Sequence, residues 1–162
     1  MIIHVEMGEG VVTESPHIIK SVGLGSCVAL ILYDSKIKIG GLAHVMHPDS
    51  IHINKNNSHI SFPYRSVDTA IETILKEMKR MGPLTKNIVA KMAGEARMFL
   101  HYEGLSKGIG EQNIMSIREL LKKEGIPLVS EDTGGNYGRS VEFHIDSGRV
   151  FIKAIGREDR EI

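Results

Sequence analysis

The segment Val28–Tyr33 constrains the fold most strongly, because every residue in it is apolar. A strand with one face in solvent alternates apolar and polar side chains, whereas a strand buried on both faces is apolar throughout. The segment therefore predicts a buried strand. Ile37–Met46 is the predicted neighbouring strand, and its paired Gly40 and Gly41 mark a place where backbone or substrate approaches closely.

Two amphipathic helices and several further strands complete the predicted fold. Apolar residues recur at helical spacing over Ser66–Met81 and from about Glu111 to Glu124, and a glycine follows each segment. Because both helices need a sheet to cover, the sequence predicts the α+β class. We expect a single-domain layered α/β sandwich over residues 1–162, with two main helices and mainly antiparallel strands. The remaining strands are expected at Ile2–Met7, Val11–Glu14, Asn87–Met92, Leu128–Glu131, Ser140–Ile145 and Arg149–Ile155, the last two joined by a hairpin turn at Asp146–Gly148.

The composition excludes several classes of partner. The 162 residues include 20 basic and 20 acidic side chains and no tryptophan, so the chain has neither the charge nor the stacking surface expected of a nucleic-acid-binding protein. No stretch approaches the roughly 20 apolar residues of a membrane helix, and the N-terminus lacks a signal-peptide pattern. With a single cysteine, the sequence predicts a soluble protein of a reducing cytoplasm that does not insert into the membrane.

The only cysteine, Cys27, follows a glycine-bracketed run, and His44 lies on the next predicted strand. If the intervening turn is symmetric about Ser35 and Lys36, Cys27 falls directly opposite His44. Directly opposed residues have Cβ atoms about 4.5–5.5 Å apart, and a one-residue slip would send the two side chains to opposite faces. The spacing thus predicts a thiol–imidazole pair. The alternative, a cysteine that only fills the core, stays open.

A paired thiol and imidazole indicate acyl chemistry. A free thiol has a pKa of about 8.5, so a neighbouring base is needed to activate it at neutral pH. His44 would supply that base, protonate a departing amine and then activate water. Ser21 is a candidate for orienting the imidazole, and the N–H groups around Gly25–Cys27 are candidates for holding the oxyanion.

Other polar motifs have structural explanations. His44, His47 and His52 invite a metal site, but they lack suitably spaced partners, so neither a metal nor a cofactor is expected. The glycine run that precedes Cys27 is followed by a strand, which argues against dinucleotide binding. Gly134–Asn136 reads as a turn, with Asn136 or Arg139 near the site. The polar stretch from Pro48 to Pro63 is either an ordinary surface loop or, because it leaves the strand that carries His44, a loop that borders the site.

Three motifs resemble the chemoreceptor glutamine deamidase family, CheD. They are SVGLGSCVA at Ser21–Ala29, GLAHVMHPDS at Gly41–Ser50 and EDTGGNYGRSV at Glu131–Val141. They occur in the family's order, and the similarity extends from about residue 5 to residue 155.

The resemblance implies an enzyme that hydrolyses selected glutamine side chains of methyl-accepting chemotaxis receptors to glutamate in receptor adaptation. It maps the nucleophile onto Cys27, the base onto His44 and the third member, typically threonine, onto Ser21. It implies receptor cytoplasmic helices as substrate and, in many members, a CheC-type phosphatase as partner. It also implies an α/β sandwich related to deamidating toxin domains.

One departure and two alternatives accompany the resemblance. The family pattern usually has glycine where this chain has Glu95, so a positive φ there would strain the backbone by about 1–3 kcal/mol. A non-catalytic regulatory module that binds a CheC-type phosphatase is the second function considered. Transamidation through the same thioester is a third.

Overall fold

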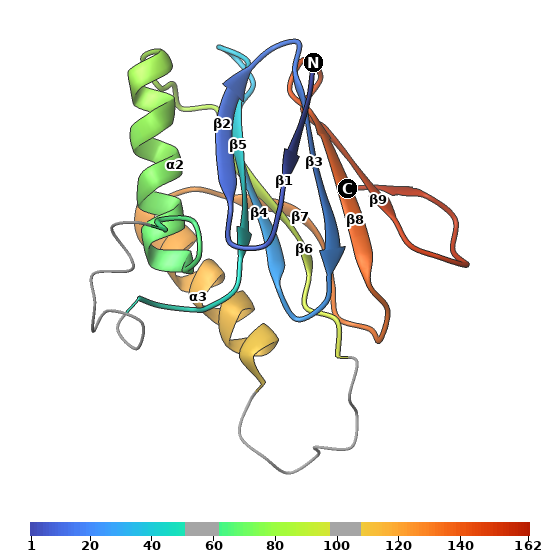
Figure 1. Cartoon of the computed structure of the whole chain (residues 1–162). Coiled ribbons are helices and arrows are strands. Elements are labelled where there is room, and N and C mark those ends of the chain that lie inside the picture. The colour runs from blue at the N-terminus through green and yellow to red at the C-terminus, as the bar shows by residue number, and fades with distance from the viewer. Residues whose placement is uncertain (51–61, 98–107) are drawn as a thin grey trace.

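The computed structural model describes residues 1–50, 62–97 and 108–162, and in these residues two β-sheets pack face to face (Figure 1). Sheet A has the order β1-β3-β8-β9-β10, and sheet B has the order β2-β5-β4-β6-β7. Most neighbours are antiparallel, but β1 runs parallel to β3 and β6 parallel to β7. The α+β prediction is therefore confirmed. The strands are β1 (Ile2–Val5), β2 (Gly10–Glu14), β3 (Ile18–Leu24), β4 (Val28–Asp34), β5 (Ile39–Val45), β6 (Ile88–Gly94), β7 (Leu128–Thr133), β8 (Arg139–His144), β9 (Arg149–Lys153) and β10 (Arg160–Glu161).

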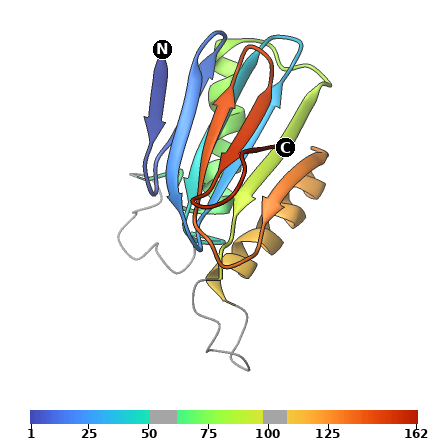
Figure 2. The same cartoon turned by 90° about the vertical axis from the view of Figure 1, so that its right-hand side faces the viewer.

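The helices α2 (Val67–Met81) and α3 (Ile109–Glu124) cover the outer face of sheet B. Figure 2 shows sheet A in front of sheet B, with both helices behind. The two helices confirm the predicted amphipathic segments. Among the described residues, no helix combines the length and apolar character needed to cross a bilayer.

Strand β4 is buried along its whole length, as its apolar sequence predicts. Its side chains alternate between two cores. Val28, Leu30 and Leu32 pack toward the helices, while Ala29, Ile31 and Tyr33 pack toward sheet A. A strand that lines two cores has no solvent face, which explains the absence of polar residues before Asp34.

Gly40 and Gly41 lie in β5 where neighbours approach closely. A Cβ at Gly40 would lie 3.0 Å from the Phe143 ring and 2.9 Å from the Leu32 carbonyl oxygen, and one at Gly41 would lie 2.8 Å from Val12. The two glycines therefore make room for packing between layers. The predicted close approach is one of backbone and core side chains.

Strand β3 is not predicted from the sequence. Only alternate residues in its first half are buried, and a bulge between Ser21 and Leu24 interrupts its pairing with β8. The bulge contains Gly23 with a φ of 73°, a conformation that glycine adopts without strain. This irregular strand brings Ser21 into the space between the sheets.

Candidate active site

Cys27 lies directly before β4 and is 8% exposed, within the core between the two sheets. The predicted direct pairing of Cys27 with His44 is wrong: Ala29 is the partner of His44, and Val28 is the partner of Val45. The difference is two residues along β4, and an even offset keeps the face. His44 therefore lies one step diagonally from Cys27 on the side of β4 and β5 that faces sheet A.

The turn between β4 and β5 explains this register. Asp34 pairs with Ile39, so four residues, 35–38, form the loop. The Asp34 carboxylate accepts the backbone N–H groups of Lys36 and Thr85, and Lys38 adopts a φ of 52°. A contact with Thr85, far along the chain, thus helps to set where the turn begins, and no local pattern reports it.

His44 is hydrogen-bonded across the two sheets. Its Nδ1 lies 2.9 Å from the Ser21 hydroxyl, and that hydroxyl donates its proton to the Val5 carbonyl oxygen at 2.8 Å. A hydroxyl has a single proton to donate, so Ser21 accepts from His44 and Nδ1 carries the hydrogen. The Nε2 atom then holds the lone pair, and it is buried without a partner among the described residues. This is the form of imidazole that can accept a proton.

Burial pushes both groups toward their neutral forms. It raises the pKa of the Cys27 thiol above its ordinary value and lowers the pKa of His44 below 6.5. At neutral pH the pair is therefore a thiol and a neutral imidazole, not a thiolate and an imidazolium. Charge separation would have to develop during a reaction.

The loop that carries Cys27 is anchored through its carbonyl oxygens. The Gly25 carbonyl accepts the N–H of Ala96 at 2.7 Å, and the Cys27 carbonyl accepts the N–H of Glu95 at 3.1 Å. The N–H groups of Gly25, Ser26 and Cys27 have no backbone acceptor in the part of the chain that the structure describes. They are the donors that an oxyanion would need.

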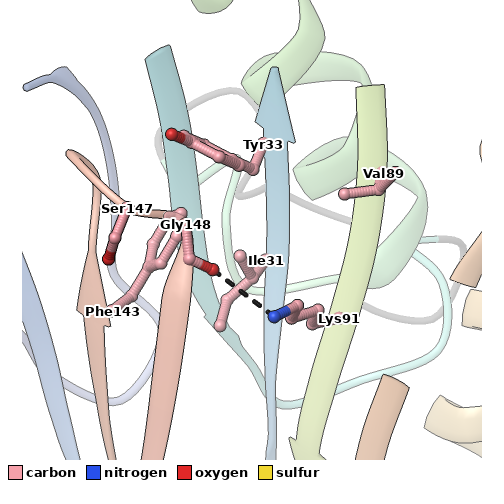
Figure 3. Close-up of a pocket in the computed structure, with 7 residues that line it drawn as sticks. All are labelled: Ile31, Tyr33, Val89, Lys91, Phe143, Ser147 and Gly148. Carbon is pink, nitrogen blue, oxygen red and sulfur yellow. Dashed lines mark hydrogen bonds between the residues drawn. The ribbon is translucent and has the colours of Figure 1, made fainter. Parts of the chain in front are cut away.

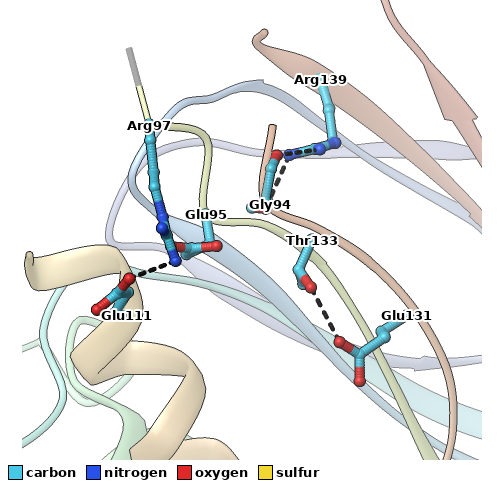
Figure 4. Close-up of polar contacts among 8 residues, drawn as sticks. Gly94, Glu95, Arg97, Glu111, Glu131, Thr133 and Arg139 are labelled. Atoms are coloured by element: carbon cyan, nitrogen blue, oxygen red, sulfur yellow. Dashed lines mark hydrogen bonds and ion pairs between the residues drawn. The ribbon is translucent and has the colours of Figure 1, made fainter. Parts of the chain in front are cut away.

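Glu95 has a φ of 59°, so the condition under which a glutamate is strained at this position is met. Its side chain is almost fully buried and bonds to Arg97, whose guanidinium also pairs with Glu111 on α3 (Figure 4). The first of these ion pairs gives Glu95 a charged partner that a glycine would not have. Together the two pairs join the end of β6 to the first turn of α3.

Gly94 and Arg139 support the backbone around Cys27, a role that the sequence alone does not predict for either residue. Gly94 packs so tightly on the Cys27 carbonyl that a Cβ would lie 2.3 Å from its oxygen. Arg139 is buried and donates a hydrogen bond to the Gly94 carbonyl oxygen, while Asn136 is exposed. The glycine-rich third motif was the available signal for Arg139. Gly94 lacked one.

Two further predictions concern the polar stretch after His47 and a histidine metal site. His52 and residues 53–60 of the polar stretch are outside the described residues. Within the described ranges, no cluster of three or more His, Cys, Asp or Glu side chains could hold a metal ion.

A pocket of about 180 Å³ opens between the sheets near Ile31, Tyr33 and Phe143. There the Lys91 ammonium donates to the Gly148 carbonyl oxygen (Figure 3). None of Cys27, His44 and Ser21 lines this pocket.

Comparison with known proteins gives consistent matches. The family described as CheD chemotactic sensory transduction matches residues 46–154. A protein of Caldanaerobacter subterraneus subsp. tengcongensis named probable chemoreceptor glutamine deamidase CheD is 44% identical, over 96% of this chain and 94% of its own. The chemoreceptor glutamine deamidase CheD of Thermotoga maritima is 40% identical, over 93% and 90%. A probable CheD of Archaeoglobus fulgidus is 43% identical, over 84% and 83%.

Proposed function

This chain belongs to the CheD family, and from that premise we propose that it hydrolyses glutamine side chains of chemotaxis receptors to glutamate, with Cys27 as nucleophile, His44 as base and Ser21 as the group that orients His44. The observation that carries the assignment is the Ser21–His44 hydrogen bond. It leaves Nε2 as a buried proton acceptor, without a hydrogen-bond partner in the described part of the chain, on the face shared with Cys27.

The first half-reaction forms a thioester. His44 Nε2 takes the Cys27 proton while the sulfur attacks the carbon of the side-chain amide. The N–H groups of the Gly25–Cys27 loop stabilise the negative oxygen of the tetrahedral intermediate. When the C–N bond breaks, the His44 imidazolium returns the proton to the nitrogen, which leaves as ammonia.

The second half-reaction releases glutamate. His44 removes a proton from water, and the resulting hydroxide attacks the thioester carbon. The C–S bond breaks, and the sulfur regains its proton from His44. Throughout both steps Ser21 keeps the Nδ1 hydrogen occupied, so that Nε2 alone exchanges protons.

Three further features belong to the proposal. Residues 1–162 form one deamidase domain, which the near-full-length alignments support. The substrate is a chemoreceptor, as the relatives' names indicate. On the family resemblance, the modified glutamines lie on the receptor's cytoplasmic helices, so the protein acts in the cytoplasm. A CheC-type phosphatase is the proposed regulatory partner, on the family resemblance alone.

The test is to incubate the protein with receptor cytoplasmic fragments and follow glutamine-to-glutamate conversion by mass spectrometry. Cys27→Ala and His44→Ala should abolish conversion, whereas His4→Ala, which changes an exposed histidine on β1, should leave it unchanged. Conversion by Cys27→Ala would refute the mechanism. If the wild type binds a CheC-type phosphatase but converts no glutamine, the non-catalytic module is the correct reading.

A further inference from the structure

Arg139 is a buried arginine in a position where a charge is costly. It begins β8, pairs with Leu24 at the end of β3, and its side chain is 1% exposed. A guanidinium taken out of water needs hydrogen bonds and a counter-charge to be tolerated. The contacts that satisfy it therefore indicate what it holds in place.

Those contacts converge on the strand and loop behind Cys27. Nη1 donates to the Gly94 carbonyl oxygen at 2.8 Å (Figure 4), and Nη2 donates to the Gly134 carbonyl oxygen. Nε lies 3.6 Å from the Asp132 carboxylate, which is buried and supplies the counter-charge. The Tyr137 ring lies 4.3 Å from the guanidinium carbon. The planar fork of arginine makes both carbonyl contacts at once, which a lysine cannot reproduce.

The Gly94 carbonyl belongs to the same peptide unit as the Glu95 N–H. The carbonyl accepts from Arg139 and from the Gly134 N–H at 3.1 Å, while the N–H donates to the Cys27 carbonyl oxygen at 3.1 Å. A charged donor on one side of a peptide strengthens the bond that the other side makes. The peptide between residues 94 and 95 thus links the guanidinium directly to the backbone of the cysteine.

The backbones of Gly94 and Cys27 are closely packed. A Cβ on Gly94 would lie 2.3 Å from the Cys27 oxygen and 3.1 Å from the Val28 Cα. The Gly94 backbone therefore lies directly against the backbone of Cys27 and Val28, with no room for a side chain between them. The next N–H along, that of Ala96, holds the Gly25 carbonyl, so the whole Gly25–Cys27 loop depends on the same short segment of backbone.

We propose that Arg139 is a positioning residue for the reaction: through the peptide between Gly94 and Glu95 it holds Cys27 and the neighbouring N–H groups where the sulfur can attack. This inference rests on the proposed function, in which Cys27 is the nucleophile. It gives the third sequence motif a role at the site of the first. Arg139 itself touches no reacting atom.

The test compares Arg139→Lys with the wild type at a temperature where circular dichroism shows both to be folded. Since misplacing a reacting group by about 1 Å can cost about 100-fold in rate, we expect kcat to fall at least tenfold while KM changes less than threefold. Hydrogen exchange of the Glu95 amide should accelerate relative to that of Ala90, which donates to the Pro127 carbonyl away from the loop. A role in stability alone would lower the unfolding temperature and leave both readouts unchanged, and that result overturns the proposal.

Arg160→Lys is the matched control. Arg160 pairs with the same Asp132 but makes no contact with Gly94, and its side chain is largely exposed. It should show wild-type kcat and Glu95 exchange. If it slows the reaction as much as Arg139→Lys does, Asp132 and not the Gly94 peptide carries the effect, and the proposal fails.

Two further measurements keep the result interpretable. If Arg139→Lys does not fold, Asp132→Asn is the substitute, because it removes the counter-charge of the guanidinium. It should lower kcat less than tenfold and accelerate hydrogen exchange of the Glu95 amide. If neither kcat nor the exchange rate changes, the proposal is overturned. Alkylation of Cys27 by iodoacetamide needs no receptor substrate, so a changed rate in Arg139→Lys supports positioning even if the wild type proves not to deamidate. An unchanged rate with unchanged Glu95 exchange contradicts it.

Discussion

At the scale of single residues, the thiol and the imidazole of the candidate site rest in their neutral forms. Burial alone accounts for the direction of both pKa shifts. In the proposed mechanism, the thiolate nucleophile therefore forms only as the Cys27 proton passes to His44. The reactivity of free Cys27 and the rate of catalysis should therefore depend on pH in different ways.

Alkylation of Cys27 by iodoacetamide should be slow at neutral pH and should still be rising above pH 8.5, where an ordinary thiol is half ionised. Below the pKa of a thiol, each pH unit lowers the thiolate fraction tenfold. Because the pKa of Cys27 is raised, its thiolate fraction at neutral pH is smaller than that of an ordinary thiol. Because the chain has one cysteine, intact mass reports this site alone. The urea-unfolded protein provides the unperturbed reference. Faster labelling of the folded protein at pH 7 would contradict the neutral pair.

Catalysis should instead have its acid limb below about pH 6.5. The lowered pKa of His44 keeps the imidazole neutral at pH 7, and kcat/KM falls only as the pH drops through that lowered value. The pH profile of glutamine conversion measures this directly. An acid limb above 6.5 would show that His44 is not the essential base.

Ser21→Ala should lower kcat by about tenfold or more, because the Nδ1 hydrogen loses its acceptor and the imidazole its orientation. The buried N–H left without a partner should also cost about 1–3 kcal/mol of unfolding free energy. Ser21→Thr keeps the hydroxyl and should retain activity. Ser15→Ala, which removes an exposed hydroxyl bonded to Asp146, is the control for loss of a serine. Wild-type kcat in Ser21→Ala would exclude the orienting role.

At the scale of elements, β6 ends at Gly94, a position where a side chain would collide with the backbone of Cys27. Gly94→Ala would place a methyl group against the Cys27 oxygen at a φ of 129°. We expect a loss of at least about 2 kcal/mol in unfolding free energy, measured by urea denaturation. Gly108→Ala, at the N-cap of α3, would place no Cβ within 4 Å of another described residue and has a φ of −63°, so its effect should stay below about 1 kcal/mol. Equal losses of unfolding free energy in the two variants would show that the backbone at the end of β6 can move to accommodate a methyl group.

The elements that the sequence predicted are those whose pattern is local. The apolar run of β4 and the helical spacing of α2 need no knowledge of distant residues, and both are confirmed. Strand β3 escaped prediction because a bulge interrupts its alternation. The predicted register of β4 and β5 was wrong because the register depends on a contact between Asp34 and Thr85, which forms only in the folded chain.

The candidate site divides in the same way. Cys27 and His44 stand out from residue type and spacing, and Ser21 from its place in a motif. The structure adds the Ser21–His44 contact between the sheets and the dependence of Cys27 on Gly94. Neither follows from sequence spacing, since one joins two separate sheets and the other joins β6 to a loop more than 60 residues earlier.

At the scale of the whole molecule, the site exists only while the two sheets stay packed, since Ser21 lies on sheet A and His44 on sheet B. Phe143 lies at this interface, fully buried, with its ring edge-on to Tyr33 at a centroid distance of 5.6 Å. The Tyr33 hydroxyl also donates to the Ile145 carbonyl oxygen at 2.6 Å. Packing and hydrogen bonding thus join the layers at one place.

Phe143→Ala should cost about 3–5 kcal/mol and lower the unfolding temperature by about 6–20 °C. Loss of ellipticity and exposure of Cys27 to alkylation should occur in one transition on heating, because the sheets part together. Phe151→Ala, a change on the neighbouring β9 where the ring is only partly buried, is the matched control and should cost less. Cys27 exposure well below the main transition would show that the site opens independently.

The solitary thiol also has a consequence for oxidative damage. Oxidants convert a cysteine first to a sulfenic acid, and a second thiol in the same protein can trap that species as a reversible disulfide. This chain contains no second cysteine, so an oxidised Cys27 can be restored only by a thiol from another molecule. Its burial and raised pKa slow the oxidation itself, because the thiolate is the reactive form. Cys27 is therefore protected from oxidation by being protonated at rest, and its reduction after oxidation depends on a thiol of another molecule.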